Sequence, residues 1–114
     1  MSNRPIHLYL ADILESGNAI ASYVRDIDFA DFTKDRMRYS AVIREFEIIG
    51  EAVAKLPEEV KQKYTAVAWR DIKDFRNLLI HEYFGVDLEI VWNTANQELP
   101  VLVSTVRNLL DESR

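Results

Sequence analysis

Apolar residues recur at intervals of three and four along several stretches of the chain, the pattern of helices with one buried face. The first stretch predicts a helix over residues 6–24. A second begins after an acidic turn, with Asp31 or Thr33 as a plausible N-cap, and reaches Leu56. Pro57 ends it, because the residue before a proline avoids helical backbone angles.

A short connector helix over Glu58–Lys63 and two further long helices complete the pattern. The third long helix is expected from about Trp69 to Phe84. The last opens near Asp87 and should be kinked by Pro100, which removes one helical hydrogen bond. Four amphipathic helices with short connections predict an all-α fold, an antiparallel four-helix bundle.

Composition narrows the class further. A chain of 114 residues fits one domain, and 48% hydrophobic residues with 3 Gly and 3 Pro argue against disorder and many-stranded β folds. With no Cys and 2 His, we expect neither a metal nor a cofactor, and we interpret His7 as a surface residue.

No apolar run approaches the roughly 20 residues of a membrane span, and the N-terminus lacks an apolar signal core. We therefore expect a cytoplasmic protein without a membrane partner.

The third long helix carries the polar residues of chemical interest. At 100° per residue, Arg70, Lys73, Asn77 and His81 share an arc of about 80°. Asn77 and His81 are four residues apart and can touch across one turn, while Arg76 borders the stripe. Because the net charge is −5, an RNA substrate would need such a local basic patch, with Arg70 and Lys73 as candidate contacts.

These residue types suit cleavage of an RNA phosphodiester without a metal. His81 can transfer protons, and the guanidinium of Arg76 can stabilise the charge on the phosphorane. One imidazole cannot easily serve both sides of one phosphorus, so a two-fold dimer would supply a second His81. The spacing fits equally well an ordinary polar helix end with Arg76 in a surface ion pair.

A glycine, two tryptophans and a basic cluster each allow two structural or functional interpretations. Gly50 interrupts a helix and suggests a close crossing with another helix or subunit. Trp69 and Trp92 lie at apolar spacings that favour core or dimer burial over base stacking. A basic cluster either extends an RNA-binding cleft or forms a solvated face paired with acidic neighbours; its members are Lys34, Arg36, Arg38 and Arg44.

Residues 76–83, Arg-Asn-Leu-Leu-Ile-His-Glu-Tyr, resemble the Arg-x4-His-x-Tyr motif of the HepT-like toxins in the HEPN superfamily. Segments 46–52, 69–72, 83–87 and 90–92 are similar to that family as well, so the likeness covers about residues 38–100 and, more loosely, both terminal helices. It implies a HEPN-type bundle that dimerises, placing two motifs in a shared cleft that cuts RNA without metal. In that reading Arg76 and His81 are catalytic, and Asn77 supports them.

The resemblance also implies a partner. Members of this family are typically encoded beside a minimal nucleotidyltransferase antitoxin, which transfers AMP from ATP onto the motif tyrosine, here Tyr83. AMP on Tyr83 would place a phosphate near Arg76 and His81 and silence the toxin. From spacing alone, Tyr83 fits packing beside Phe84 as well.

Two alternatives belong to other functional classes. One is a non-catalytic HEPN module that docks a nucleotidyltransferase partner. The other is a plain oligomerisation bundle in which Arg76 and His81 point to separate surfaces.

Overall fold

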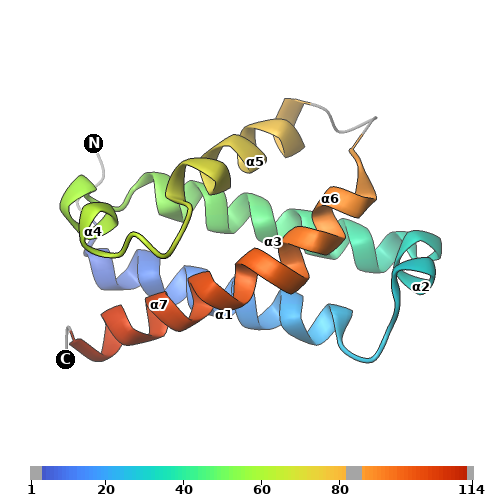
Figure 1. Ribbon diagram of the computed structural model, residues 1–114, viewed down its shortest axis with the longest axis horizontal. Coiled ribbons are helices and arrows are strands. Elements are labelled where there is room, and N and C mark those ends of the chain that lie inside the picture. The colour runs from blue at the N-terminus through green and yellow to red at the C-terminus, as the bar shows by residue number, and fades with distance from the viewer. Residues whose placement is uncertain (1–3, 82–85, 113–114) are drawn as a thin grey trace.

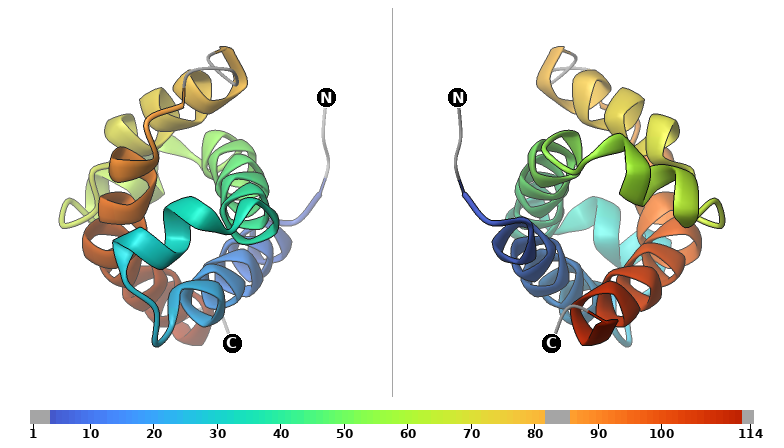
Figure 2. Two further views of the ribbon diagram at one scale, coloured as in Figure 1. Left: turned by 90° about the vertical axis from the view of Figure 1, so that its right-hand side faces the viewer. Right: turned by 90° about the vertical axis from the view of Figure 1, so that its left-hand side faces the viewer.

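Four long helical segments pack along a shared apolar core, and two short helices lie at opposite ends of the bundle (Figures 1 and 2). The computed structural model describes residues 4–81 and 86–112, and this part of the chain is helical without strands. The elements are α1 (Ile6–Val24), α2 (Phe29–Lys34), α3 (Arg36–Ala54), α4 (Glu58–Lys63), α5 (Trp69–His81), α6 (Leu88–Asn93), η1 (Thr94–Glu98) and α7 (Leu99–Glu112). The predicted all-α class is confirmed.

The bounds of α1 and α4 agree with the prediction. Asp87 caps α6 as expected, because its carboxylate accepts a hydrogen bond of 2.9 Å from the backbone N–H of Glu89. The sequence places the end of α5 at Phe84. The described part of this helix ends at His81, and Phe84 lies outside the described residues.

The predicted start of the second long helix is wrong, because the region contains the end of one helix, α2, and the start of another, α3. Asp28 caps α2 through a capping box, in which the N–H of Asp31 donates to Asp28 at 2.8 Å and Asp31 accepts in return at 3.4 Å. Asp35 then caps the separate helix α3. α3 ends at Ala54, earlier than the predicted Leu56.

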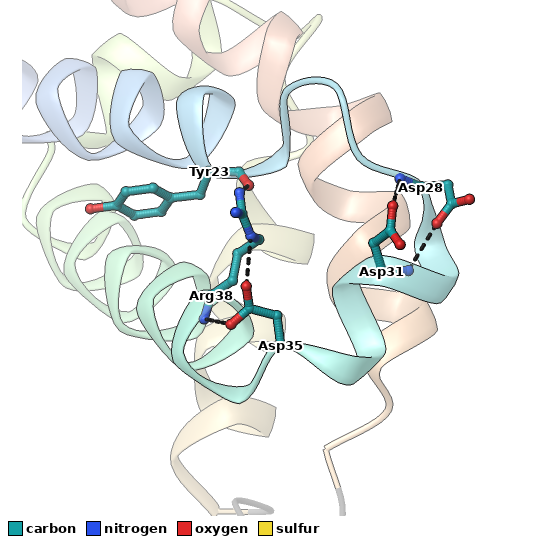
Figure 3. A network of polar contacts seen from close by, with 5 residues as sticks. All are labelled: Tyr23, Asp28, Asp31, Asp35 and Arg38. Carbon is teal, nitrogen blue, oxygen red and sulfur yellow. Dashed lines mark hydrogen bonds and ion pairs between the residues drawn. The ribbon is translucent and has the colours of Figure 1, made fainter.

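Asp35 and Arg38 fix the junction between α2 and α3 (Figure 3). The backbone N–H and the Nε of Arg38 both donate to the Asp35 carboxylate at 3.1 Å, and the guanidinium also donates to the carbonyl of Tyr23 at the end of α1. The backbone hydrogen bond and the adjacent guanidinium lower the pKa of Asp35. One arginine thereby ties α1 to the start of α3.

The buried core draws residues from all four long segments. Its most enclosed side chains are Phe32, Ile13, Ile20, Ile49, Leu79, Val42, Val53, Val91 and Val106. Trp69 and Trp92 are half-buried against it, as their spacing predicted. The ring of Trp92 lies 5.2 Å from that of Phe32, and the indole of Trp69 donates to the carbonyl of Tyr64 at 2.9 Å.

The last long segment departs from α-helical geometry just before Pro100. The backbone N–H of Leu99 donates to the carbonyl of Thr94, five residues back, so Thr94–Glu98 forms a π-helical turn between α6 and α7. In a regular helix the ring of Pro100 would clash with the carbonyl of Asn96. The wider turn gives Pro100 room at the position where the sequence predicts a kink.

Within the described ranges, none of the helices combines the length and the apolar character that a membrane span requires.

Candidate functional site

α5 carries the motif residues, and it is held by a close crossing with α3 at Gly50. An ideal Cβ placed on Gly50 would lie 2.4 Å from Cβ and 2.5 Å from Cγ of Arg76. No side chain fits in that space, so the aliphatic part of Arg76 lies directly on the backbone of α3. The predicted close crossing at Gly50 is confirmed as a contact between two helices of one chain.

The crossing with α3 partly encloses the guanidinium of Arg76. The side chain is half-buried, and its Nε is shielded from solvent without a hydrogen bond to any described residue. No ion pair joins Arg76 to the described part of the chain, so the reading of a surface ion pair gains no support. An unsatisfied buried N–H costs on the order of 1–3 kcal/mol, and an anion at this position would offset that cost.

The other motif residues lie along α5. Asn77 is half-buried, whereas Lys73 and Arg70 are exposed and form no ion pair with a described residue. The backbone of His81 closes α5, but its side chain lies outside the described residues, as does the whole of Tyr83. The contact between Asn77 and His81 therefore stays a prediction.

An apolar groove, here called the α5 groove, runs between α5 and the last helical segment. It has a volume of about 520 Å³ and is lined mainly by Ile72, Phe75, Leu78, Ile90 and Val101, with Asp71, Asp74 and Glu98 among its acidic residues. Ile90 and Val101 are 43% and 41% exposed. Apolar periodicity predicts one buried face on each helix, and it does not indicate that residues such as Ile90 and Leu78 line an open groove instead.

A second groove, here called the α3 groove, follows the N-terminal half of α3. Its volume is about 330 Å³, and it is lined by Arg36, Tyr39, Ser40, Ile43, Arg44, Glu47 and Val86. It contains two members of the basic cluster for which the sequence left two readings open. No cluster of metal-ligating side chains occurs among the described residues.

The chain is similar to known proteins over most of its length. A family model described as "Ribonuclease HepT-like" matches residues 13–109. A "Putative RNase" from Caldanaerobacter subterraneus subsp. tengcongensis is 42% identical over 93% of this chain and 95% of its own. Another "Putative RNase", from Methanocaldococcus jannaschii, is 38% identical over 93% of this chain and 97% of its own.

A "Probable ribonuclease HepT" from Thermococcus cleftensis is 42% identical, covering 82% of this chain and 86% of that protein. No solved structure matches the chain significantly. The matched range, 13–109, includes the whole of α3 and α5 and thus the crossing at Gly50.

The crossing at Gly50 generates a prediction about Arg76. In Gly50→Ala the new methyl group meets Cβ and Cγ of Arg76, which are too close to the α5 backbone to swing aside. Overpacking costs about 1–3 kcal/mol, and alanine returns up to about 1 kcal/mol of helix propensity, so we expect a net loss of stability of about 0–3 kcal/mol. Hydrogen exchange of the Arg76 Nε–H, followed by NMR, should become faster as the group is exposed.

Gly17→Ala is the matched control. Its methyl group would lie 2.6 Å from Cγ2 of Val103, at the contact between α1 and α7. A loss of stability similar to that of Gly50→Ala is expected, without any change in the Arg76 Nε–H. Equal exchange of this proton in wild type and Gly50→Ala would show that the glycine does not hold the arginine.

Proposed function

This chain belongs to the HepT-like ribonuclease family of the HEPN superfamily, and we propose that it is a metal-independent endoribonuclease toxin with Arg76 and His81 at its reaction centre. The observation that carries this proposal is the placement of Arg76. Its stem rests on Gly50, and its Nε has no acceptor among the described residues. Such a preorganised cation suits a phosphate whose negative charge increases during the reaction.

The proposed reaction begins when a base takes the proton of the ribose 2′-hydroxyl, whose oxygen attacks the adjacent phosphorus. The bond to the 5′-oxygen breaks, and an acid protonates that leaving oxygen. The products are a 2′,3′-cyclic phosphate and a free 5′-hydroxyl. His81 exchanges the protons, Arg76 stabilises the phosphorane, and Asn77, one turn before His81, orients the imidazole. Lys73 and Arg70 are exposed on the same helix, where they can contact flanking phosphates.

The reaction needs a proton acceptor and a proton donor on opposite sides of the phosphorus, and a homodimer would supply two His81 side chains. The α5 groove supports the proposal of a homodimer. It exposes apolar residues from two helical segments, including Ile90 and Val101. Apolar side chains gathered in one exposed groove are a feature that subunit interfaces share.

Regulation by a minimal nucleotidyltransferase antitoxin completes the proposal. The hydroxyl oxygen of Tyr83 would attack the α-phosphate of ATP, pyrophosphate would leave, and AMP would remain on the tyrosine. Tyr83 is two residues after His81, so the added phosphate would compete with RNA for Arg76 and His81.

Cleavage without metal is the first test. Purified wild-type protein should cut single-stranded RNA in excess EDTA, whereas His81→Ala should be slower by about 10²–10⁴-fold. Arg76→Lys keeps the charge but loses the planar fork, so we expect a loss of about tenfold or more in the cleavage rate. Melting temperatures of both variants establish that they fold. RNA that survives equally with wild type and His81→Ala would favour a non-catalytic module that docks a nucleotidyltransferase.

Subunit mass tests the dimer. Light scattering should give twice the 13.3 kDa of one chain. Ile90→Glu with Val101→Glu should shift the protein to monomer, because the dimer would have to bury the new carboxylates in its contact. Met37→Glu is the control, because Met37 is 82% exposed on α3, away from the α5 groove. A wild-type mass of 13.3 kDa would contradict the dimer. A dimer that persists in the double variant would place the contact elsewhere.

Intact mass tests the modification. Co-expression with a nucleotidyltransferase encoded beside this protein should add AMP to the wild type and abolish RNA cleavage. Tyr83→Phe should gain no AMP and keep its activity in the presence of the partner. Modification that persists in Tyr83→Phe would show that another residue accepts the group.

A further inference from the structure

We propose that the α3 groove is a binding subsite for the RNA backbone, in which Arg36 and Arg44 contact phosphates flanking the scissile one. This inference rests on the proposed function, because it assumes an RNA substrate held at Arg76. It extends the site from α5 onto the N-terminal half of α3, to residues outside the Arg-x4-His motif.

The geometry of α3 connects the groove to Arg76. Arg36, Tyr39, Ile43 and Glu47 share a face of about 80° with Gly50, the residue on which Arg76 rests. Gly50 lies fourteen positions after Arg36, which corresponds to about 21 Å along the helix axis. A strand bound at Arg76 can therefore follow one side of α3 toward its N-terminus.

The path of α5 leaves this side of α3 accessible. α5 crosses α3 at Gly50 and then rises away from it toward its C-terminal end (Figure 1). Val86, five residues after the end of α5, lines the α3 groove together with the α3 side chains. The groove thus lies between the basic half of α3 and the chain that follows the motif.

The two arginines of the groove are available for an anion. Arg36 is exposed and has no ion pair within the described part of the chain. Arg44 is 71% exposed, and its only ion pair there is with Glu47 at 3.3 Å. Exposed pairs contribute little stability, so Arg44 can exchange that carboxylate for a phosphate. Arg38 differs, because Asp35 and the Tyr23 carbonyl already hold its guanidinium (Figure 3).

The remaining lining favours a nucleotide over a bare anion. Tyr39 and Ile43 are half-buried and offer an apolar surface for a base or ribose, and the Ser40 hydroxyl can donate to a phosphate oxygen. Glu47 is the opposing charge in the groove, and its pairing with Arg44 keeps that guanidinium at the groove before RNA binds. With a net charge of −5, the protein depends on such local cations to bind RNA.

The test measures RNA binding in a His81→Ala background, by fluorescence anisotropy of a labelled single-stranded RNA at several salt concentrations. Arg36→Gln with Arg44→Gln should lower the affinity about tenfold at low salt. The slope of log affinity against log salt should become shallower by about 1.4, or about 0.7 for each phosphate that an arginine no longer neutralises. In the active protein the same double variant should raise KM about tenfold and leave kcat unchanged.

Arg25→Gln with Arg107→Gln is the matched control. Both arginines are exposed and lie outside the α3 groove, and replacing them removes the same number of positive charges. Equal affinity and salt slope in the two double variants would overturn the subsite, while cleavage that depends on His81 would leave the proposed function standing. Binding that depends on Arg36 and Arg44 without any cleavage would support the subsite and contradict the proposed activity. No RNA binding at all would overturn both.

Discussion

The contact between Gly50 and Arg76 is the constraint on which the proposed site depends. A guanidinium is normally surrounded by water or paired with an acid, and here its stem is pressed onto a helix backbone and its Nε is buried without an acceptor among the described residues. Only glycine at position 50 allows α5 to approach α3 this closely. One missing methyl group therefore fixes both the crossing of two helices and the position of a charge.

The other side of α5 is packed less completely, and this asymmetry has functional consequences. Leu79 is 1% exposed and anchors the helix to the core, while Phe75 and Leu78 line the open α5 groove. The π-helical turn at Thr94–Glu98 lies on the far wall of that groove. α5 thus directs a charged residue toward α3 and leaves an apolar surface exposed on its other side, where the proposed homodimer would make its contact.

Helical periodicity predicted the four long segments, and Asp87 predicted the start of α6, because these features depend on local spacing and on single residues. The break between α2 and α3 was missed, since two caps seven residues apart, Asp28 and Asp35, look like one acidic turn in the sequence. The sequence does not distinguish the engaged Arg38 from the exposed Arg36. The structure does, because Arg38 donates a hydrogen bond to a backbone carbonyl fifteen residues away.

For the site, the sequence indicated a close crossing at Gly50 and a polar stripe on α5, but it did not bring the two together. Which residue of α5 meets Gly50 depends on the rotation of one helix against another, a tertiary property that periodicity does not encode. Arg76 was placed at the border of the polar stripe. In the structure it lies on the face of α5 that meets α3, which is why its Nε is buried.

We propose that the crossing of α3 and α5 holds Arg76 in place for catalysis, and single-turnover cleavage of RNA by Gly50→Ala and Gly17→Ala tests this role. Both substitutions add one methyl group at a close helix contact, but only Gly50 touches Arg76. We expect at least about a tenfold loss of rate in folded Gly50→Ala and a nearly wild-type rate in folded Gly17→Ala. Equal rates in the two variants would contradict the claim.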